Sequence, residues 1–177
     1  MRPGNSAVAK LPGPVSSQLM LRKSADQWFA EYGESHQDHA NEVIHWICVP
    51  LIFFSVLGFI WEIPAPDAWE TSLPWFNWSI VAIALTTLFY AWLSLPLAIG
   101  MLGFMTVCQT VHLRFEMMAP WPVWKICAVI FVLAWIGQFI GHQIEGKKPS
   151  FLKDVLFLLI GPAWLLSKVY KKVGLKY

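Results

Sequence analysis

The chain has 177 residues, of which 56% are hydrophobic and only 14% are charged. A water-soluble globule of this composition would have too little polar surface to cover itself, so the composition predicts an integral, all-helical membrane protein. The length suits one compact helical bundle and leaves no room for a second catalytic domain beside it. The formal net charge of +2 is too small to indicate a nucleic-acid partner.

The N-terminal segment differs from the rest of the chain. Residues 1 to 20 contain several prolines and glycines and no continuous apolar stretch, so we expect a disordered tail. Residues 21 to 177 are expected to form a single membrane domain. Between Gln18 and Gly33 a few apolar side chains recur among polar ones, which favours a short amphipathic helix on the membrane surface. An irregular polar leader is the alternative for this segment.

Further along the chain, apolar runs predict about four membrane-spanning helices, since a span requires roughly 20 apolar residues. The runs are Val43 to Ile63, Trp78 to Leu95, Leu97 to Leu113, and Val123 to Ile140. A fifth run, Val155 to Leu166, is short and contains Gly161 and Pro162. We therefore expect it to be a re-entrant or interfacial segment, although a full span remains the alternative.

The distribution of charge predicts the orientation. Four crossings bring the start and the end of the domain to one membrane face, together with most of the basic residues. By the positive-inside rule this face is cytoplasmic, in the inner membrane of a bacterium or the endoplasmic reticulum of a eukaryote. The opposite face receives acidic residues and a group of interfacial tryptophans, which are Trp61, Trp69, Trp75, Trp78, Trp121 and Trp124.

This topology assigns each of the five histidines to one of the two membrane faces. His36, His39 and His45 precede or open the first span and His142 closes the fourth, so all four lie at the cytoplasmic face. His112 lies near the end of the third span, at the opposite face and about 30 Å away. We expect His39 and His112 to be ordinary solvated or hydrogen-bonded residues.

The other three histidines form a candidate metal site. His36 and His45 are nine residues apart and can meet only if the chain bends between them, for which Asn41 is a suitable helix N-cap. Gln138, His142 and Glu145 recur at helical spacings of four and three, which places them on one helix face. A nitrogen-rich site with open positions suits Fe(II) better than structural zinc, although zinc is not excluded.

Two stretches carry a resemblance to a known family. Tyr32 to Pro50 reads YGESHQDHANEVIHWICVP, and Gln138 to Pro149 reads QFIGHQIEGKKP. They resemble the Mpo-like family of small membrane proteins, which is typified by a 2-hydroxy fatty acid dioxygenase. The resemblance covers roughly residues 28 to 166. Asp38 and His39 depart from the family pattern, which commonly has Asn and Pro at these two positions.

The resemblance implies an Fe(II)-dependent enzyme that uses O2 to shorten a long-chain 2-hydroxy fatty acid by one carbon, a step of α-oxidation in phytosphingosine degradation. The family's metal ligands fall on His36, His45 and His142. Asn41, Gln138 and Glu145 also match the pattern, and we expect them to be catalytic.

The surroundings of this site suggest how substrate could bind, and they leave other functions open. At the cytoplasmic boundary the acyl tail could stay among the helices while the carboxylate reaches Lys147 or Lys148. For Glu145, a salt bridge with Lys147, Lys148 or Lys153 is an equally good explanation. The alternatives to the oxygenase are a non-catalytic membrane scaffold or small transporter with structural histidines, and a zinc-dependent membrane hydrolase.

Overall fold

The structure, a computed structural model, describes residues 23–73, 75–149 and 156–177. The described residues form helices and connecting loops and contain no strand, as the composition predicts. The predicted tail, residues 1 to 20, lies outside the described residues. The helices are α1 (Ala25–Gly33), α2 (His39–Trp61), α3 (Asp67–Ser72), α4 (Trp78–Leu93), α5 (Leu95–Met118), α6 (Val123–Glu145) and α7 (Phe157–Lys172).

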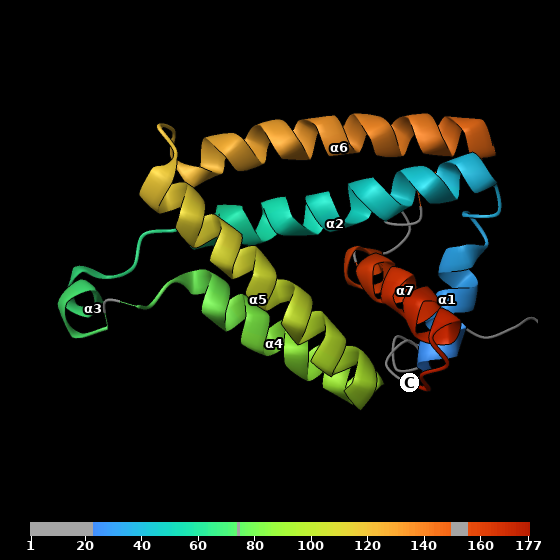
Figure 1. The fold of residues 1–177 in the computed structure, drawn as a ribbon, viewed down its shortest axis with the longest axis horizontal. Helices are drawn as coiled ribbons and strands as arrows, with labels where there is room; N and C mark the ends of the chain where they lie inside the picture. The colour runs from blue at the N-terminus through green and yellow to red at the C-terminus, as the bar shows by residue number, and fades with distance from the viewer. Residues whose placement is uncertain (1–22, 74, 150–155) are drawn as a thin grey trace, which may run out of the picture.

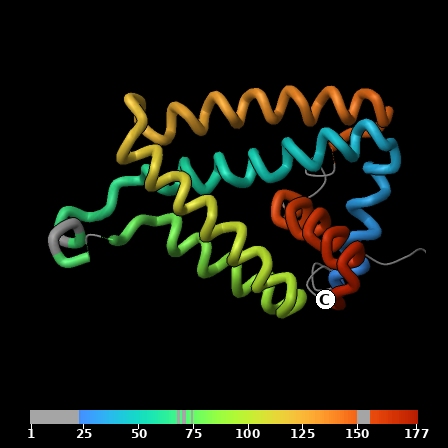
Figure 2. Tube along the Cα trace, in the orientation of Figure 1, coloured from blue at the N-terminus to red at the C-terminus, as the bar shows by residue number. Residues whose placement is uncertain are grey.

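Two antiparallel helix pairs make up the body of the protein (Figure 1). Helices α2 and α6 lie side by side along their length, and α4 and α5 form the second pair, inclined to the first. The trace in Figure 2 shows α1 and α7 packed at one end of the bundle and α3 at the other. The start of α2 and the end of α6 meet at the α1–α7 end, so residues about a hundred positions apart become neighbours there.

Three helices, α2, α5 and α6, are long and apolar enough to cross a membrane, and α4 is a shorter apolar helix of 16 residues. On length and composition the structure thus supports three of the four predicted spans outright. Large apolar side chains cover the outside of the bundle, among them Leu88 on α4, Ile99 on α5 and Leu133 on α6, each more than 60% exposed. Such a surface is typical of helices that contact lipid.

Glycines on α6 allow it to approach α2 closely. A Cβ atom added at Gly137 would lie 2.6 Å from Cys48 Sγ, and one added at Gly141 would lie 2.4 Å from Asn41 Oδ1. Pairs of small residues four apart are a common device for close helix contact in membranes. The close contact brings the first turns of α2 against the last turns of α6.

Helix α7 differs from the expectation for the fifth apolar run. The helix continues through Gly161 and Pro162 and extends to Lys172, whereas the sequence suggested an interruption. Gly161 has a packing role, because a Cβ atom there would lie 2.9 Å from the hydroxyl oxygen of Tyr32. Lys168 Nζ lies 2.7 Å from Glu42 Oε2. This ion pair holds α7 against the start of α2.

The amphipathic segment before the first span is helical over Ala25–Gly33. Ser24 and Gln27 form a capping box that satisfies backbone N–H groups at its start. Its apolar face packs within the protein: the rings of Trp28 and Phe157 contact edge to face with centroids 5.6 Å apart. The position of α1 on a membrane surface stays a prediction.

Candidate metal centre

His36 lies in the loop between α1 and α2, buried at 3% exposure. Its Nδ1 is 2.6 Å from the carbonyl oxygen of Tyr32, and its ring stacks on the Tyr32 ring with centroids 4.1 Å apart. Burial lowers the pKa of His36 to about 4, so the imidazole is neutral near pH 7. With Nδ1–H donating to the carbonyl, the lone pair is on Nε2.

His45 and His142 come from the two helices that pack closely. His45 is on the second turn of α2, where its Nδ1 lies 2.8 Å from the carbonyl oxygen of Asn41. His142 is in the last turn of α6. The exposed fractions are 1% for His45 and 4% for His142, so both rings are removed from solvent.

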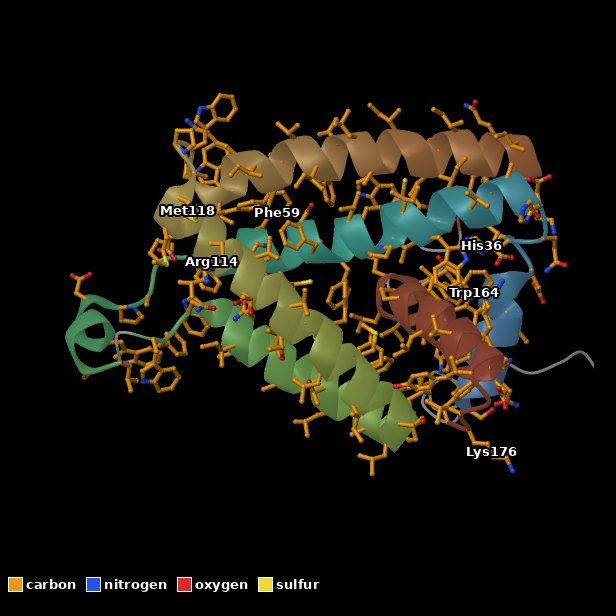
Figure 3. All side chains as sticks on the ribbon, in the orientation of Figure 1. His36, Phe59, Arg114, Met118, Trp164 and Lys176 are labelled. Carbon is orange, nitrogen blue, oxygen red and sulfur yellow. The ribbon has the colours of Figure 1, made fainter. Side chains whose placement is uncertain are left out.

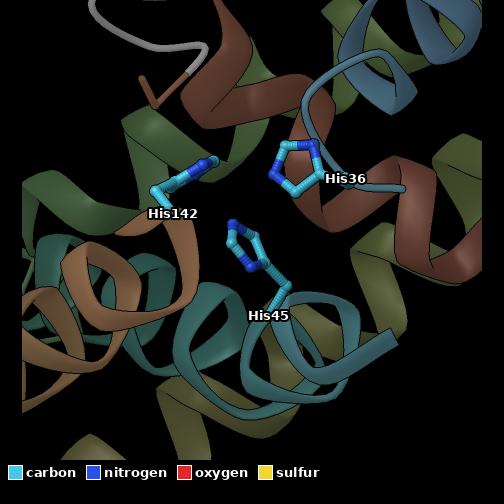
Figure 4. A group of neighbouring side chains, drawn as sticks. All are labelled: His36, His45 and His142. Carbon is cyan, nitrogen blue, oxygen red and sulfur yellow. The ribbon is translucent and has the colours of Figure 1, made fainter. Parts of the chain in front are cut away.

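The three imidazoles face one another (Figure 4). The ring centroids are 4.2 Å apart for His36 and His45, 5.1 Å for His36 and His142, and 4.9 Å for His45 and His142. One ring nitrogen of each residue can be chosen so that the three lie within 4.8 Å of one another. Nε2 of His36, Nε2 of His45 and Nδ1 of His142 have no hydrogen-bond partner among the described residues.

Buried polar atoms without a partner are costly, and three of them around one point need a common explanation. A cation bound by three neutral imidazoles supplies one, because each free lone pair then becomes a metal ligand. The residues present therefore fit a transition-metal ion. Within the described residues this is the one group of three or more potential metal ligands that lie close enough together.

Glu145 connects the two motifs that sequence analysis singled out. Its carboxylate accepts hydrogen bonds from the backbone N–H groups of Gln37 (3.0 Å) and Asp38 (2.6 Å) and from the Asn41 side chain (3.3 Å). A carboxylate is favoured here, since it faces the N-terminus of α2. Lys147 Nζ is 3.9 Å from Glu145 Oε1, so the ion pair considered in the sequence is also present.

Gln138 lies one turn before His142 on α6 and is buried at 4% exposure. No described residue accepts a hydrogen bond from its Nε2. Gln138 and His142 both line an apolar cavity of about 380 Å³. The amide therefore offers a free donor beside the three histidines.

The apolar cavity lies between α2, α6 and the start of α7. Its lining includes Val49, Ile52, Phe53 and Val56 from α2, and Trp135, Gln138 and His142 from α6. Tyr32, Pro149 and the segment Leu156 to Leu159 complete the described wall. The size is in the range of small-molecule sites, and the mainly apolar lining suits a hydrocarbon ligand.

The predicted substrate-binding lysines and the other two histidines lie outside the three-histidine group and the cavity lining. Lys147 Nζ donates to the carbonyl oxygen of Glu34, and neither Lys147 nor Lys148 is among the described residues that line the cavity. His39 is exposed at the start of α2. His112 is buried at the opposite end of the bundle, with its ring 4.2 Å from that of Phe54 and Nε2 3.8 Å from Cys127 Sγ. The three-histidine group thus forms without His39 and His112.

Two aromatic residues of this site were missed by the sequence analysis. Tyr32 supports His36 by stacking and by its carbonyl group, and Trp164 on α7 lies 5.4 Å from the His36 ring (Figure 3). The spacing of four between Tyr32 and His36 could have indicated the first contact. Nothing in the local sequence connects Trp164 with a residue 128 positions earlier in the chain.

Comparison with known proteins agrees with the motifs. The family model described as "2-hydroxy-palmitic acid dioxygenase Mpo1-like" matches residues 22–173. No curated protein and no solved structure matches the chain significantly. The family match covers the two histidine motifs and all the described helices. The chain therefore belongs to the Mpo1-like family.

Proposed function

We propose that the protein is an Fe(II)-dependent dioxygenase that shortens long-chain 2-hydroxy fatty acids by one carbon, as in the α-oxidation step of phytosphingosine degradation. The observation that carries the proposal is the convergence of His36, His45 and His142 on one point beside the apolar cavity. The family name supplies the reaction class.

The donor set favours iron over a structural zinc ion. Three neutral imidazoles leave coordination positions for substrate and O2, whereas structural zinc sites are usually closed by four protein ligands that include cysteine. The three cysteines are Cys48, Cys108 and Cys127, and none belongs to the three-histidine group. When bound, Fe(II) would supply O2 activation and chelation of the 2-hydroxy acid head group.

The chain's own residues would bind and orient the substrate. Gln138 Nε2, which has no partner among the described residues, would donate a hydrogen bond to the head group. Glu145 and Asn41 act by positioning: the carboxylate holds the loop that carries His36, and the Asn41 carbonyl orients His45. Lys147 and Lys148, which follow α6, would attract the substrate carboxylate from the cytoplasmic side.

The overall reaction balances with O2 as the sole oxidant. Converting a 2-hydroxy acid and O2 into the next lower fatty acid, CO2 and water uses the full oxidising capacity of O2. The C1–C2 bond of the substrate breaks, C2 becomes the new carboxyl carbon and C1 leaves as CO2. The enzyme then needs no separate reductant and no reductase partner.

A test uses purified protein in detergent, loaded with Fe(II) without oxygen and then supplied with 2-hydroxyhexadecanoate and O2. The expected product is pentadecanoate, and hexadecanoate, which lacks the hydroxyl group, should not be shortened. The His142→Ala protein should form no product, whereas His39→Ala should remain active. An iron-loaded wild-type protein that forms no pentadecanoate would reject the proposal.

A further inference from the structure

Two helices each carry a line of side chains that runs from a site histidine into the apolar cavity. On α2, His45 is followed by Val49, Ile52 and Val56, at spacings of four, three and four. These spacings place all four residues on one helix face. His142 belongs both to the three-histidine group and to the cavity lining, so the cavity adjoins the polar site.

The α6 line has the same order. His142 is followed, toward the start of the helix, by Gln138 and Trp135 at spacings of four and three. The second residue, Gln138, is polar and 96% buried, with its Nε2 unpartnered among the described residues. A buried amide donor between the histidines and an apolar wall indicates a ligand with a polar head and an apolar tail.

We propose that the apolar cavity holds the acyl chain of the substrate, with the head group between Gln138 and the three histidines and the methyl end directed toward Val56. This inference rests on the proposed function and adds where the tail lies and where a long tail leaves the cavity.

The length of the cavity can be judged from helix geometry. His45 and Val56 are eleven residues apart on α2, which corresponds to roughly 16 Å at the rise of an α-helix. An extended hydrocarbon advances a little over one ångström per carbon, so this path holds about a dozen carbons. Acids of sixteen or eighteen carbons therefore reach beyond Val56, and shorter acids end at or before it.

The far end of the cavity differs from its middle. Val49, Ile52 and Phe53 are at most 9% exposed, whereas Val56 is 37% exposed. The path is thus enclosed near the histidines and opens at Val56 toward the apolar outer surface. Because lipid is as apolar as the cavity, a longer tail can project through this opening without penalty. The wild-type protein should accordingly accept chains longer than the cavity.

Photolabelling tests the position of the tail without requiring turnover. Metal-free protein in detergent is irradiated with 2-hydroxyhexadecanoate that carries a diazirine either next to the head group or near the methyl end. The first probe should label peptides around Gln138, and the second should label peptides with Val56 or Trp135. Labelling should disappear with excess unmodified acid. Equal labelling of the outer faces of α4 and α5 by both probes would overturn the proposal.

A substitution at Val56 tests whether a long acyl tail passes this residue. Val56→Trp should close the far opening and lower kcat/KM for 2-hydroxyoctadecanoate at least about tenfold relative to 2-hydroxydodecanoate. Ile47→Trp is the matched control, since Ile47 is on α2, 61% exposed and outside the described cavity lining. The control should leave the ratio unchanged. An unchanged ratio in the Val56→Trp protein would contradict the proposed tail position.

Photolabelling and the assay for pentadecanoate together separate the proposed tail position from the proposed oxygenase activity. Site-directed labelling without any pentadecanoate formation would retain the tail position and reject the oxygenase. Pentadecanoate formation with labelling on the outer helix faces would retain the oxygenase and reject the tail position.

Discussion

The backbone N–H of Asp38 donates a hydrogen bond of 2.6 Å to Oε2 of Glu145, although 107 residues separate the two in the chain. This contact joins the end of α6 to the start of α2, and it lies beside the loop that carries His36. The Glu145 carboxylate, which is not one of the candidate metal ligands, therefore helps to hold the three histidines together.

We expect Glu145→Ala to lower both the stability and the metal affinity of the protein. The substitution leaves the N–H groups of Gln37 and Asp38 without their acceptor; because Gln37 is exposed and Asp38 only half-buried, water replaces part of the loss and the cost should lie at or below about 1 kcal/mol. Glu145→Gln keeps one acceptor oxygen and should lose less. Thermal unfolding in detergent and a metal titration check both effects.

Variants of Glu145 also distinguish a positioning role of this residue from a direct role in the reaction. A positioning role predicts that Glu145→Gln, once saturated with iron, recovers most of the wild-type turnover. If the saturated variant stays inactive while its stability and iron content are normal, Glu145 acts directly in the chemistry.

Removing any one of the three clustered histidines should abolish stable iron binding. His36→Ala, His45→Ala and His142→Ala each remove one imidazole of the group whose ligand atoms lie within 4.8 Å of one another. His39→Ala is the control, because His39 is exposed at the start of α2. Metal analysis after anaerobic purification measures the outcome. Normal iron content in the His36→Ala and His142→Ala proteins would instead favour a structural role for the histidines.

Metal binding should stabilise the folded protein. Since the unfolded chain does not hold the three imidazoles together, iron at about a hundred times its Kd should add about 2.7 kcal/mol to the free energy of unfolding. Chelation should reverse the increase in Tm. The His45→Ala protein should show no iron-dependent increase, and an equal increase in that variant would place the stabilising ion elsewhere.

The glycines of α6 offer a test of the close helix contact. A Cβ atom at Gly141 would lie 2.4 Å from Asn41 Oδ1, so Gly141→Ala should cost about 1–3 kcal/mol and weaken metal binding by displacing Asn41. Gly103→Ala on α5 is the control, because no described atom lies within 4 Å of the added Cβ.

The control is expected to change the free energy of unfolding in the opposite direction. Replacing a helical glycine by alanine at an open position stabilises the helix by about 0.5–1 kcal/mol. Similar Tm values for the Gly141→Ala and Gly103→Ala proteins would show that the α2–α6 contact is looser than the structure indicates.

Much of the fold follows from local sequence properties. Long apolar runs predict the helices α2, α5 and α6, because a helix of about 20 apolar residues matches the bilayer. Alternating crossings then place His36, His45 and His142 at one end of the bundle and His112 at the other. The motifs around His36 and His142 also predict the correct family.

Tertiary structure alone decided how these parts meet. Helical periodicity tells which face of α6 carries Gln138, His142 and Glu145, but the partner of each side chain depends on another helix. Glu145 could have paired with several lysines, and its main partners are instead backbone N–H groups of the α2 N-terminus. Gly161 of α7 lies against Tyr32 of α1, a contact that the local sequence of neither helix indicates.

The sequence by itself determined the long apolar helices, the end of the bundle at which each histidine lies, and the residue types available for chemistry, because hydrophobicity and spacing along the chain are local properties. The tertiary structure decided that three imidazoles share one point and that an apolar cavity adjoins them. Both features depend on the distance between helices, which is set by glycines, aromatic contacts and hydrogen bonds between segments far apart in the chain.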